Sequence, residues 1–257
     1  MSEPTRARAR QPAAASVDAE EVARFAALAE RWWDSEGPMK PLHALNPTRI
    51  AFVRDRVAEH FGRDPLAERP LRGLGLLDVG CGGGLLSEPM ARLGADVTAI
   101  DAAGENLRIA ALHARDGGLT IDYRNSSVEA LAAARGRYDV VLNMEVIEHV
   151  ADLDVFLAAA CALVKPGGMT IVATINRTPQ AFALAIVGAE YLLRWLEPGT
   201  HQWRKFVRPA ELARKLRRGG VAVGEMTGVR YNPLTQSWSL GRDLSVNYMA
   251  VGYKENE

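Results

Sequence analysis

Alternating apolar and polar segments run through the central part of this 257-residue chain. Short apolar runs, typical of strands buried on both faces, recur between segments whose apolar residues have helical spacing. The predicted strands cover 74–79, 96–100, 119–124, 138–144 and 169–175. The predicted helices between them cover 84–93, 104–116, 127–134 and 152–163. This alternation predicts a doubly wound, Rossmann-like α/β sheet with helices on both faces.

Two further helices are predicted before the first strand. The first begins at Asp18, where Glu21 completes a capping-box-like pattern, and keeps helical spacing as far as Trp32. The second begins with Asn46 as N-cap and Pro47 at the first helical position. These cap helices, residues 18–61, are placed either to cover a pocket at the strands' carboxyl ends or simply to pack on the core.

The rest of the chain adds a helix from Arg208 and strands near 221–229 and 245–253. The sheet therefore has seven predicted strands, with the last one antiparallel. Residues 1–17, rich in Ala, Arg and Pro, are expected to be a disordered tail. Residues 18–257 are expected to form a single domain that carries an insertion at 179–206.

The composition is that of an ordinary soluble protein and excludes several classes of function. Lys and Arg together number 31, as do Asp and Glu, so no overall positive field favours nucleic acid. The two cysteines, Cys81 and Cys161, do not suggest a disulfide framework and match a reducing, cytoplasmic compartment. No Cys/His cluster suggests structural zinc.

The most informative segment is D-V-G-C-G-G-G at 78–84, a glycine-rich turn after the first strand. Glycine permits positive φ and close approach of a ligand, and Asp101, at the tip of the second strand, suits the two hydroxyls of a ribose. A dinucleotide fingerprint requires a third glycine where this chain has Leu85, and Asp78 would lie unfavourably near a diphosphate. The turn therefore favours a cationic cofactor without phosphates over a nicotinamide-dependent oxidoreductase.

Several motifs together resemble the family of ubiquinone biosynthesis O-methyltransferases, which are class I S-adenosylmethionine-dependent enzymes. They are the glycine-rich turn, N-M-E-V-I-E-H-V at 143–150, L-V-K-P-G-G at 163–168, R-W-W-D at 31–34, K-P-L-H at 40–43, N-P-x-R at 46–49, V-G-A-E-Y at 187–191 and Y-N-P at 231–233. The resemblance covers about residues 18–253. It implies methylation of the hydroxyls of polyprenyl-catechol and demethylubiquinol intermediates.

The resemblance also implies a set of S-adenosylmethionine contacts at Arg49, Gly80, Asp101 and Met144. Each residue has a suitable property: Arg49 can pair with the cofactor's carboxylate, and Met144 offers an adaptable apolar face to the adenine. Gly80 lets the backbone approach the amino-acid part, and Asp101 suits the ribose. Residues 126–128 follow the third strand, where the adenine amine is commonly met in such folds.

Glu145, Glu148 and His149 follow the fourth strand with i, i+3, i+4 spacing, which places them on one face of a helical turn. They are predicted to bind a divalent ion that lowers the hydroxyl's pKa, and the resemblance implies magnesium. Alternatively, His149 is the general base and a glutamate such as Glu145 orients it. A polar helix start without a catalytic role is the third interpretation.

The insertion at 179–206 contains two apolar runs, which a basic cluster at His201, Arg204, Lys205 and Arg208 follows directly. It is too short and interrupted to span a bilayer, and it suits peripheral attachment to the inner membrane, or a lid over the pocket. Contact with lipid would give access to a polyprenyl tail, and association with other ubiquinone-pathway enzymes is a further expectation. The alternatives are methylation of another small hydroxylated aromatic and a non-catalytic scaffold.

Overall fold

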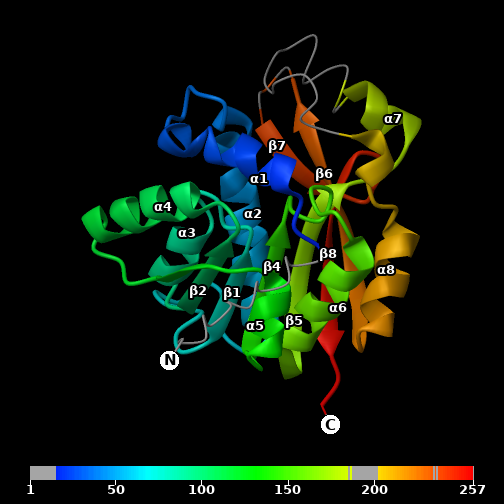
Figure 1. Cartoon of the computed structure of the whole chain (residues 1–257). Helices are drawn as coiled ribbons and strands as arrows, with labels where there is room; N and C mark the ends of the chain where they lie inside the picture. The colour runs from blue at the N-terminus through cyan, green and yellow to red at the C-terminus, as the bar shows by residue number, and fades with distance from the viewer. Residues whose placement is uncertain (1–15, 185, 187–201, 234, 236, 257) are drawn as a thin grey trace, which may run out of the picture.

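A single mixed sheet organises the residues described by the computed structural model, which are 16–184, 186, 202–233, 235 and 237–256. The strand order is β3-β2-β1-β4-β5-β8-β6-β7 (Figure 1). The strands are β1 (Gly75–Val79), β2 (Asp96–Asp101), β3 (Asp122–Asn125), β4 (Tyr138–Met144), β5 (Val164–Ile175), β6 (Val221–Asn232), β7 (Ser237–Gly241) and β8 (Asn247–Lys254). The first five are parallel, and β8 runs antiparallel to both β5 and β6.

Helices cover both faces of this sheet, which confirms the predicted fold class. They are α1 (Ala19–Ala26), α2 (Lys40–His60), α3 (Ser87–Arg92), α4 (Gly104–Asp116), α5 (Val128–Ala133), α6 (Leu153–Leu163), α7 (Pro179–Ala181) and α8 (Pro209–Arg218), with 3-10 turns η1 (Ala29–Arg31) and η3 (Trp203–Lys205). No helix within the described residues is both long and apolar enough to cross a membrane.

Alternation along the strands divides the core between the two faces. In β1, Leu76 packs into a cluster with α2, α3 and α4, while Leu77 packs into a second cluster with α5, α6 and α8. Successive side chains of a strand point to opposite faces, so a run buried on both sides is apolar throughout. This burial explains why the central strands are recognisable as short apolar runs.

The described part of the sheet has eight strands, and not the seven that the sequence predicts. The additional strand is β7, which pairs antiparallel with β6 as the outer arm of a hairpin. Its sequence, S-W-S-L-G, contains no apolar run because it is an edge strand whose residues remain partly exposed. The predicted antiparallel last strand is confirmed as β8.

The predicted start of α2 is wrong. The helix begins at Lys40, with Pro41 in its first turn, so Pro47 lies inside the helix. Asn46 is not a cap: its side chain is buried and donates a hydrogen bond to the carbonyl of Leu85 at 2.7 Å. The motif therefore joins α2 to the segment that follows the glycine-rich turn.

The first cap helix is shorter than predicted, although its predicted start is correct. The Asp18 carboxylate accepts hydrogen bonds from the backbone of Glu20 at 3.1 Å and of Glu21 at 3.4 Å. The α-helix ends at Ala26, and η1 continues toward Trp32. Of the predicted tail, residues 1–15 lie outside the described part. Ser16 is buried, and its carbonyl accepts a hydrogen bond from the amide of Ala151.

The carboxyl ends of β1, β2 and β4 lie side by side at the point where the strand order changes direction. Val79 is in register with Ile100 on one side and with Asn143 on the other. In α/β sheets such a switch point opens a crevice beyond the strand ends. Helix α1 lies at this end of the sheet, toward which the arrow of β4 points (Figure 1).

Candidate active site

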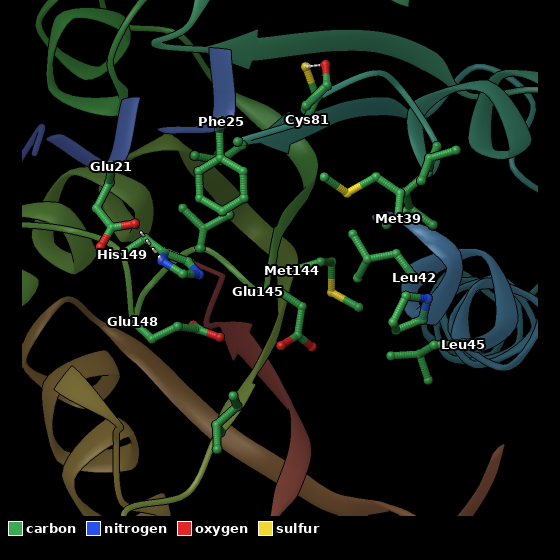
Figure 2. Close-up of a pocket in the computed structure, with 18 of the residues that line it drawn as sticks. Glu21, Phe25, Met39, Leu42, Leu45, Cys81, Met144, Glu145, Glu148 and His149 are labelled. Carbon is green, nitrogen blue, oxygen red and sulfur yellow. Dashed lines mark hydrogen bonds and ion pairs between the residues drawn. The ribbon is translucent and has the colours of Figure 1, made fainter. Parts of the chain in front are cut away.

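A cavity of about 740 Å³ lies beyond the carboxyl ends of β1, β2 and β4. Its wall combines the turns after these strands with the two cap helices and with residues of β6 and β7. Figure 2 shows Phe25 of α1 and Met39 and Leu42, at the start of α2, facing the side chains that follow β4. The cap helices therefore cover a pocket at the strand ends, which is the first of the two predicted arrangements.

The glycine-rich turn brings its backbone close to the cavity. Gly80 has a φ of 66°, and a Cβ atom there would lie 2.5 Å from Val146 Cγ2. The Asp101 carboxylate holds the turn by accepting hydrogen bonds from the amides of Gly82 at 2.9 Å and Ala103 at 2.8 Å. Burial raises the pKa of Asp101, and these hydrogen bonds oppose the rise. Both Gly80 and Asp101 line the cavity.

Two adjacent tryptophans close over the same turn. The Trp32 ring lies against Gly82, so closely that a Cβ atom on Gly82 would collide with the ring. The Nε1 of Trp32 donates a hydrogen bond to the Oδ1 of Asn106 at 3.0 Å. The Nε1 of Trp33 donates to the carbonyl of Gly83 at 3.0 Å. These contacts join the N-terminal cap to the glycine-rich turn. The sequence marks the tryptophans only as an aromatic stripe and a family motif.

Arg49 carries a buried guanidinium toward the cavity. Its Nη2 donates to Asn46 at 2.9 Å, while its Nε has no hydrogen-bond partner among the described residues. Burial lowers the pKa of Arg49, and the charges of Glu145 and Asp78 oppose this effect. Burial also raises the pKa of Asp78 to about 6, although Ser87 donates a hydrogen bond to it at 2.6 Å. An unpaired buried donor of this kind fits a ligand carboxylate.

Met144 and Glu145 mark the end of β4 at the cavity. Met144 is buried at the wall, consistent with the apolar contact predicted for it. Glu145 adopts a φ of 58°, which is uncommon for a residue other than glycine, and its amide donates to the carbonyl of Ala173 at 3.0 Å. Such backbone conformations are held by surrounding structure and cluster at functional sites.

Glu148 is buried and turned toward the sheet. Its Oε2 accepts a hydrogen bond from the hydroxyl of Thr174 at 2.8 Å, while its Oε1 has no partner among the described residues. Burial, followed by the neighbouring charge of Glu145, raises the pKa of Glu148 well above its usual range. Burial in this position therefore favours the neutral form of the Glu148 carboxyl over the charged one.

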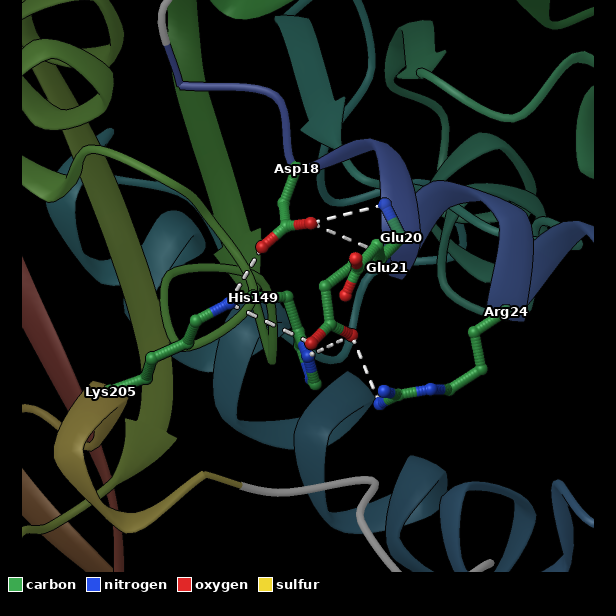
Figure 3. Close-up of polar contacts among 6 residues, drawn as sticks. All are labelled: Asp18, Glu20, Glu21, Arg24, His149 and Lys205. Atoms are coloured by element: carbon green, nitrogen blue, oxygen red, sulfur yellow. Dashed lines mark hydrogen bonds and ion pairs between the residues drawn. The ribbon is translucent and has the colours of Figure 1, made fainter.

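His149 turns instead toward the N-terminal cap. Its Nδ1 lies 3.2 Å from the Oε2 of Glu21 (Figure 3), and its ring makes a T-shaped contact with the ring of Phe25, with centroids 5.1 Å apart. Glu21 is thus a site residue that the sequence analysis treats only as part of a helix cap. It lies 128 residues from His149 along the chain, so no local pattern connects the two.

The predicted three-ligand metal site needs Glu145, Glu148 and His149 to converge. His149 faces Glu21 while Glu148 faces Thr174, and no described group of three or more His, Cys, Asp or Glu side chains has an arrangement that could hold a metal ion. Of the three residues, Glu148 has a buried oxygen, Oε1, that has no hydrogen-bond partner among the described residues and could accept a cation. As they lie, the three residues do not fit the predicted site.

Only part of the insertion falls within the described residues. V-G-A-E-Y at 187–191 and His201 lie outside them. Leu184 lines the cavity and is also 60% exposed, and Phe182 is 45% exposed. Arg204 and Lys205 follow in η3. The described flanks of the insertion therefore supply both apolar and basic side chains near the cavity.

Comparison with known proteins defines the class. A family model described as a methyltransferase domain matches residues 77–172. The crystal structure of a magnesium protoporphyrin IX methyltransferase from Synechocystis PCC 6803 with bound SAM aligns with a TM-score of 0.61 and 16% identity, covering 94% of this chain and 99% of that one. A SAM-dependent methyltransferase from Thermotoga maritima aligns with a TM-score of 0.59 and 18% identity, covering 92% and 99%. The fold is therefore that of the class I methyltransferases.

Full-length relatives narrow this class to one family. The ubiquinone biosynthesis O-methyltransferase of Methylobacterium sp. (strain 4-46) is 56% identical over 93% of this chain and 96% of its own length. That of Sinorhizobium medicae (strain WSM419) is 55% identical over 94% of this chain and 97% of its own length. The chain belongs to the family of ubiquinone biosynthesis O-methyltransferases, and the resemblance seen in its motifs is confirmed.

The contact between Trp32 and the glycine-rich turn predicts a large loss of stability in Gly82→Ala. A left-handed conformation costs an alanine roughly 1–2 kcal/mol. Forcing the new methyl group into a packed ring adds about 1–3 kcal/mol. Denaturant unfolding monitored by circular dichroism measures the sum.

The matched control is Gly118→Ala. Gly118 also has a positive φ, of 69°, but no described atom lies within 4 Å of the position that its Cβ would take. This variant isolates the backbone cost of roughly 1–2 kcal/mol. Equal losses of stability in the two variants would show that Trp32 does not press on the turn.

Proposed function

We propose that this chain methylates the hydroxyl groups of polyprenyl-catechol and demethylubiquinol intermediates of ubiquinone biosynthesis, with S-adenosylmethionine as methyl donor. The observation that carries the proposal is the make-up of the cavity, which combines ionisable groups such as Asp101 and Glu145 at the strand ends with apolar side chains of the cap helices such as Phe25 and Leu42. A polar aromatic head group and an apolar tail need such a combination. The full-length relatives are named as O-methyltransferases of ubiquinone biosynthesis, which argues against a nicotinamide-dependent oxidoreductase.

The four residues predicted to contact the cofactor all line the cavity, and each has a group that suits its predicted role. Arg49 presents its unpartnered Nε for the cofactor's carboxylate, and the positive φ of Gly80 brings the backbone to the cavity wall. Asp101 retains acceptor capacity for the ribose hydroxyls, because each of its oxygens accepts a single backbone hydrogen bond. Met144 offers its apolar side chain beside the adenine.

Methyl transfer is an in-line displacement, so most of the rate enhancement comes from placing the substrate oxygen opposite the leaving sulfur. Bound S-adenosylmethionine supplies the methyl group as a sulfonium electrophile. A phenol with a pKa of about 10 is a weak nucleophile at neutral pH, and a general base increases its reactivity. His149 is the proposed base, and Glu145, which follows β4, lines the same cavity (Figure 2).

Asp101→Ala is expected to weaken binding of S-adenosylhomocysteine by at least about a hundredfold. Hydrogen bonds to a charged group contribute about 1.5–3 kcal/mol each, and two are lost with the carboxylate. Isothermal titration calorimetry measures the change.

The matched control for this experiment is Asp116→Ala, since Asp116 is exposed at the end of α4 and does not line the cavity. Its affinity should equal that of the unmodified protein. A thermal melt of Asp101→Ala checks that the glycine-rich turn remains folded. Unchanged affinity in a folded Asp101→Ala would place the cofactor elsewhere.

Methyl transfer from labelled S-adenosylmethionine to a prenylated catechol tests the activity itself. We expect turnover by the unmodified chain and a loss of about 10²–10⁴-fold in kcat for His149→Gln, the range typical of a general base. The KM for S-adenosylmethionine should not change. Cofactor binding without transfer to any prenylated catechol would direct attention to another small hydroxylated aromatic.

The same assay with EDTA and added magnesium tests the predicted metal requirement. Activity lost to EDTA and restored by Mg²⁺ would confirm it, and would require rearrangement of the side chains after β4. Activity that is indifferent to chelation would assign deprotonation to His149 without a metal. Glu148→Ala distinguishes these cases further. If Glu148 binds the metal, this variant should need a different concentration of Mg²⁺ for activation, and if it does not, that concentration should stay the same.

The described flanks of the insertion support peripheral attachment to the inner membrane. Exposed Phe182 and Leu184 belong to the same insertion as the basic residues Arg204 and Lys205, and Arg208 follows it. Apolar side chains can enter the headgroup region while neighbouring cations pair with anionic lipid. Such attachment would give the prenylated substrate a route from the bilayer into the cavity.

We expect the chain to co-sediment with vesicles that contain phosphatidylglycerol, less so at high salt, and not with pure phosphatidylcholine. Phe182→Ser should weaken this binding at least about tenfold, because burial of a large apolar side chain contributes about 1.5–3 kcal/mol. Leu66→Ser is the control, since Leu66 is 81% exposed outside the insertion. Equal weakening by both variants would argue against attachment through this segment.

A further inference from the structure

The C-terminal strands carry a part of the cavity wall that the predicted cofactor contacts do not use. Trp238 of β7 and Asn247, the first residue of β8, both line the cavity. The Nε1 of Trp238 and the Oδ1 of Asn247 are buried and have no hydrogen-bond partner among the described residues. We propose that these two atoms bind the oxygen-bearing ring of the substrate. Asn247 accepts a hydrogen bond from a hydroxyl that is not methylated, and Trp238 donates one to another ring oxygen. This inference rests on the proposed function.

The register of the strands places the two side chains on one face of the sheet. Asn247 pairs with Val229 of β6, and Tyr231 of the same strand pairs with Trp238. Paired residues, and residues two apart along a strand, point to the same face, so these four side chains form one strip. All four line the cavity. The hairpin of β6 and β7 extends to the end of the sheet at which α1 lies (Figure 1).

The two unpartnered atoms have opposite hydrogen-bonding character. The indole Nε1 of Trp238 can only donate, and the amide Oδ1 of Asn247 can only accept. Nearly all buried polar groups in folded proteins have partners, and leaving one unpaired costs free energy. A ring that carries several oxygens satisfies both atoms, because a hydroxyl proton suits the acceptor and any ring oxygen suits the donor. The strip is therefore suited to a catechol or a quinol.

The donor is held in place by its neighbours. The ring of Trp238 lies 5.1 Å from that of Tyr231, measured between centroids, at an interplanar angle of 52°. Trp238 also packs against the core cluster that contains residues of α2 and β1. These contacts restrict rotation of the indole, and a binding group whose rotamer is locked by packing binds more selectively. Tyr231, which begins the Y-N-P motif, therefore supports the donor.

The acceptor determines which hydroxyl group can react. A hydroxyl bound to Asn247 directs its proton at an amide oxygen, which is too weak a base to remove it. The oxygen that receives the methyl group loses its proton, so it is not the oxygen held by Asn247. A methoxy group has no proton to donate and leaves the acceptor unpaired. A site built to bind a hydroxyl discriminates strongly against a ligand that lacks it.

Ligand binding to the chain saturated with S-adenosylhomocysteine tests the acceptor. The ligands are a catechol with a short prenyl chain and its dimethyl ether, which keeps both oxygens but cannot donate a hydrogen bond. Isothermal titration calorimetry gives the ratio of the dissociation constant of the ether to that of the catechol. Asn247→Leu should lower this ratio about 5–100-fold, because the hydrogen bond from the catechol is lost. An unchanged ratio would overturn the proposal for Asn247.

Two further variants control this experiment. Asn247→Ala removes the acceptor without adding bulk, and it should lower the ratio as Asn247→Leu does. Asn256→Leu makes the same substitution at an exposed position that does not line the cavity, and it should leave the ratio unchanged. The affinity for S-adenosylhomocysteine should stay the same in every variant. A parallel loss of that affinity would assign Asn247 a structural role and overturn the proposal.

Trp238→Phe tests the donor, because it keeps an aromatic ring beside Tyr231 and removes the N–H group. Both ligands should bind about 3–10-fold more weakly, and their ratio should not change, since both retain acceptor oxygens. Trp203→Phe is the control, because the Nε1 of Trp203 donates to the carbonyl of Thr178 at 3.2 Å and Trp203 does not line the cavity. Unchanged affinity of Trp238→Phe for both ligands would overturn the role of the donor.

These titrations need no methyl transfer, so they separate this proposal from the proposed function. If the catechol is methylated but the ratio is the same in Asn247→Leu, the function stands and this binding site is wrong. If the ratio falls as expected without transfer to the catechol, the binding site is supported and the methyl acceptor is another hydroxylated ring. Failure of the folded chain to bind the catechol would overturn the binding site and the proposed substrate together.

Discussion

The absence of Cβ atoms at Gly82 and Gly83 is the constraint on which the rest of the site depends. The Trp32 side chain occupies the space that those atoms would fill, so the N-terminal cap can lie directly on the turn after β1. The same contact closes the cavity above the strand ends and brings α1 within reach of the segment after β4. Close packing of this kind tolerates little change in volume.

The ionisable groups of the site are all buried, but they differ in how many oppositely charged side chains lie near them. Arg49 interacts with the charges of Asp78 and Glu145, so its desolvation is partly offset before any ligand arrives. Glu21 is better compensated, because His149, Arg24 and Lys205 surround it. For Glu148, burial and the neighbouring charge of Glu145 both raise the pKa, and the hydrogen bond from Thr174 opposes them only in part. These differences sort chemically similar carboxylates into distinct roles.

The fold is largely predictable from local patterns, and the exceptions have identifiable causes. Central strands such as β1 and β4 are buried on both faces and have apolar runs, whereas the edge strand β7 does not and is missed. Pro47 suggests a helix start, but α2 continues through it because its neighbours bury Asn46 and Arg49 against the site. Local propensity gives way where tertiary packing compensates the lost backbone hydrogen bond.

By itself, the sequence determined the class of fold, the glycine-rich turn, Asp101 and the family, because these depend on residues close together in the chain or on recognisable motifs. The tertiary structure alone decided how the residues after β4 divide: Glu148 faces the sheet, whereas His149 faces Glu21. Spacing placed them on one helical face, but the positive φ of Glu145 and the approach of α1 set their directions. A contact across 128 residues exists only once the sheet has brought its ends together.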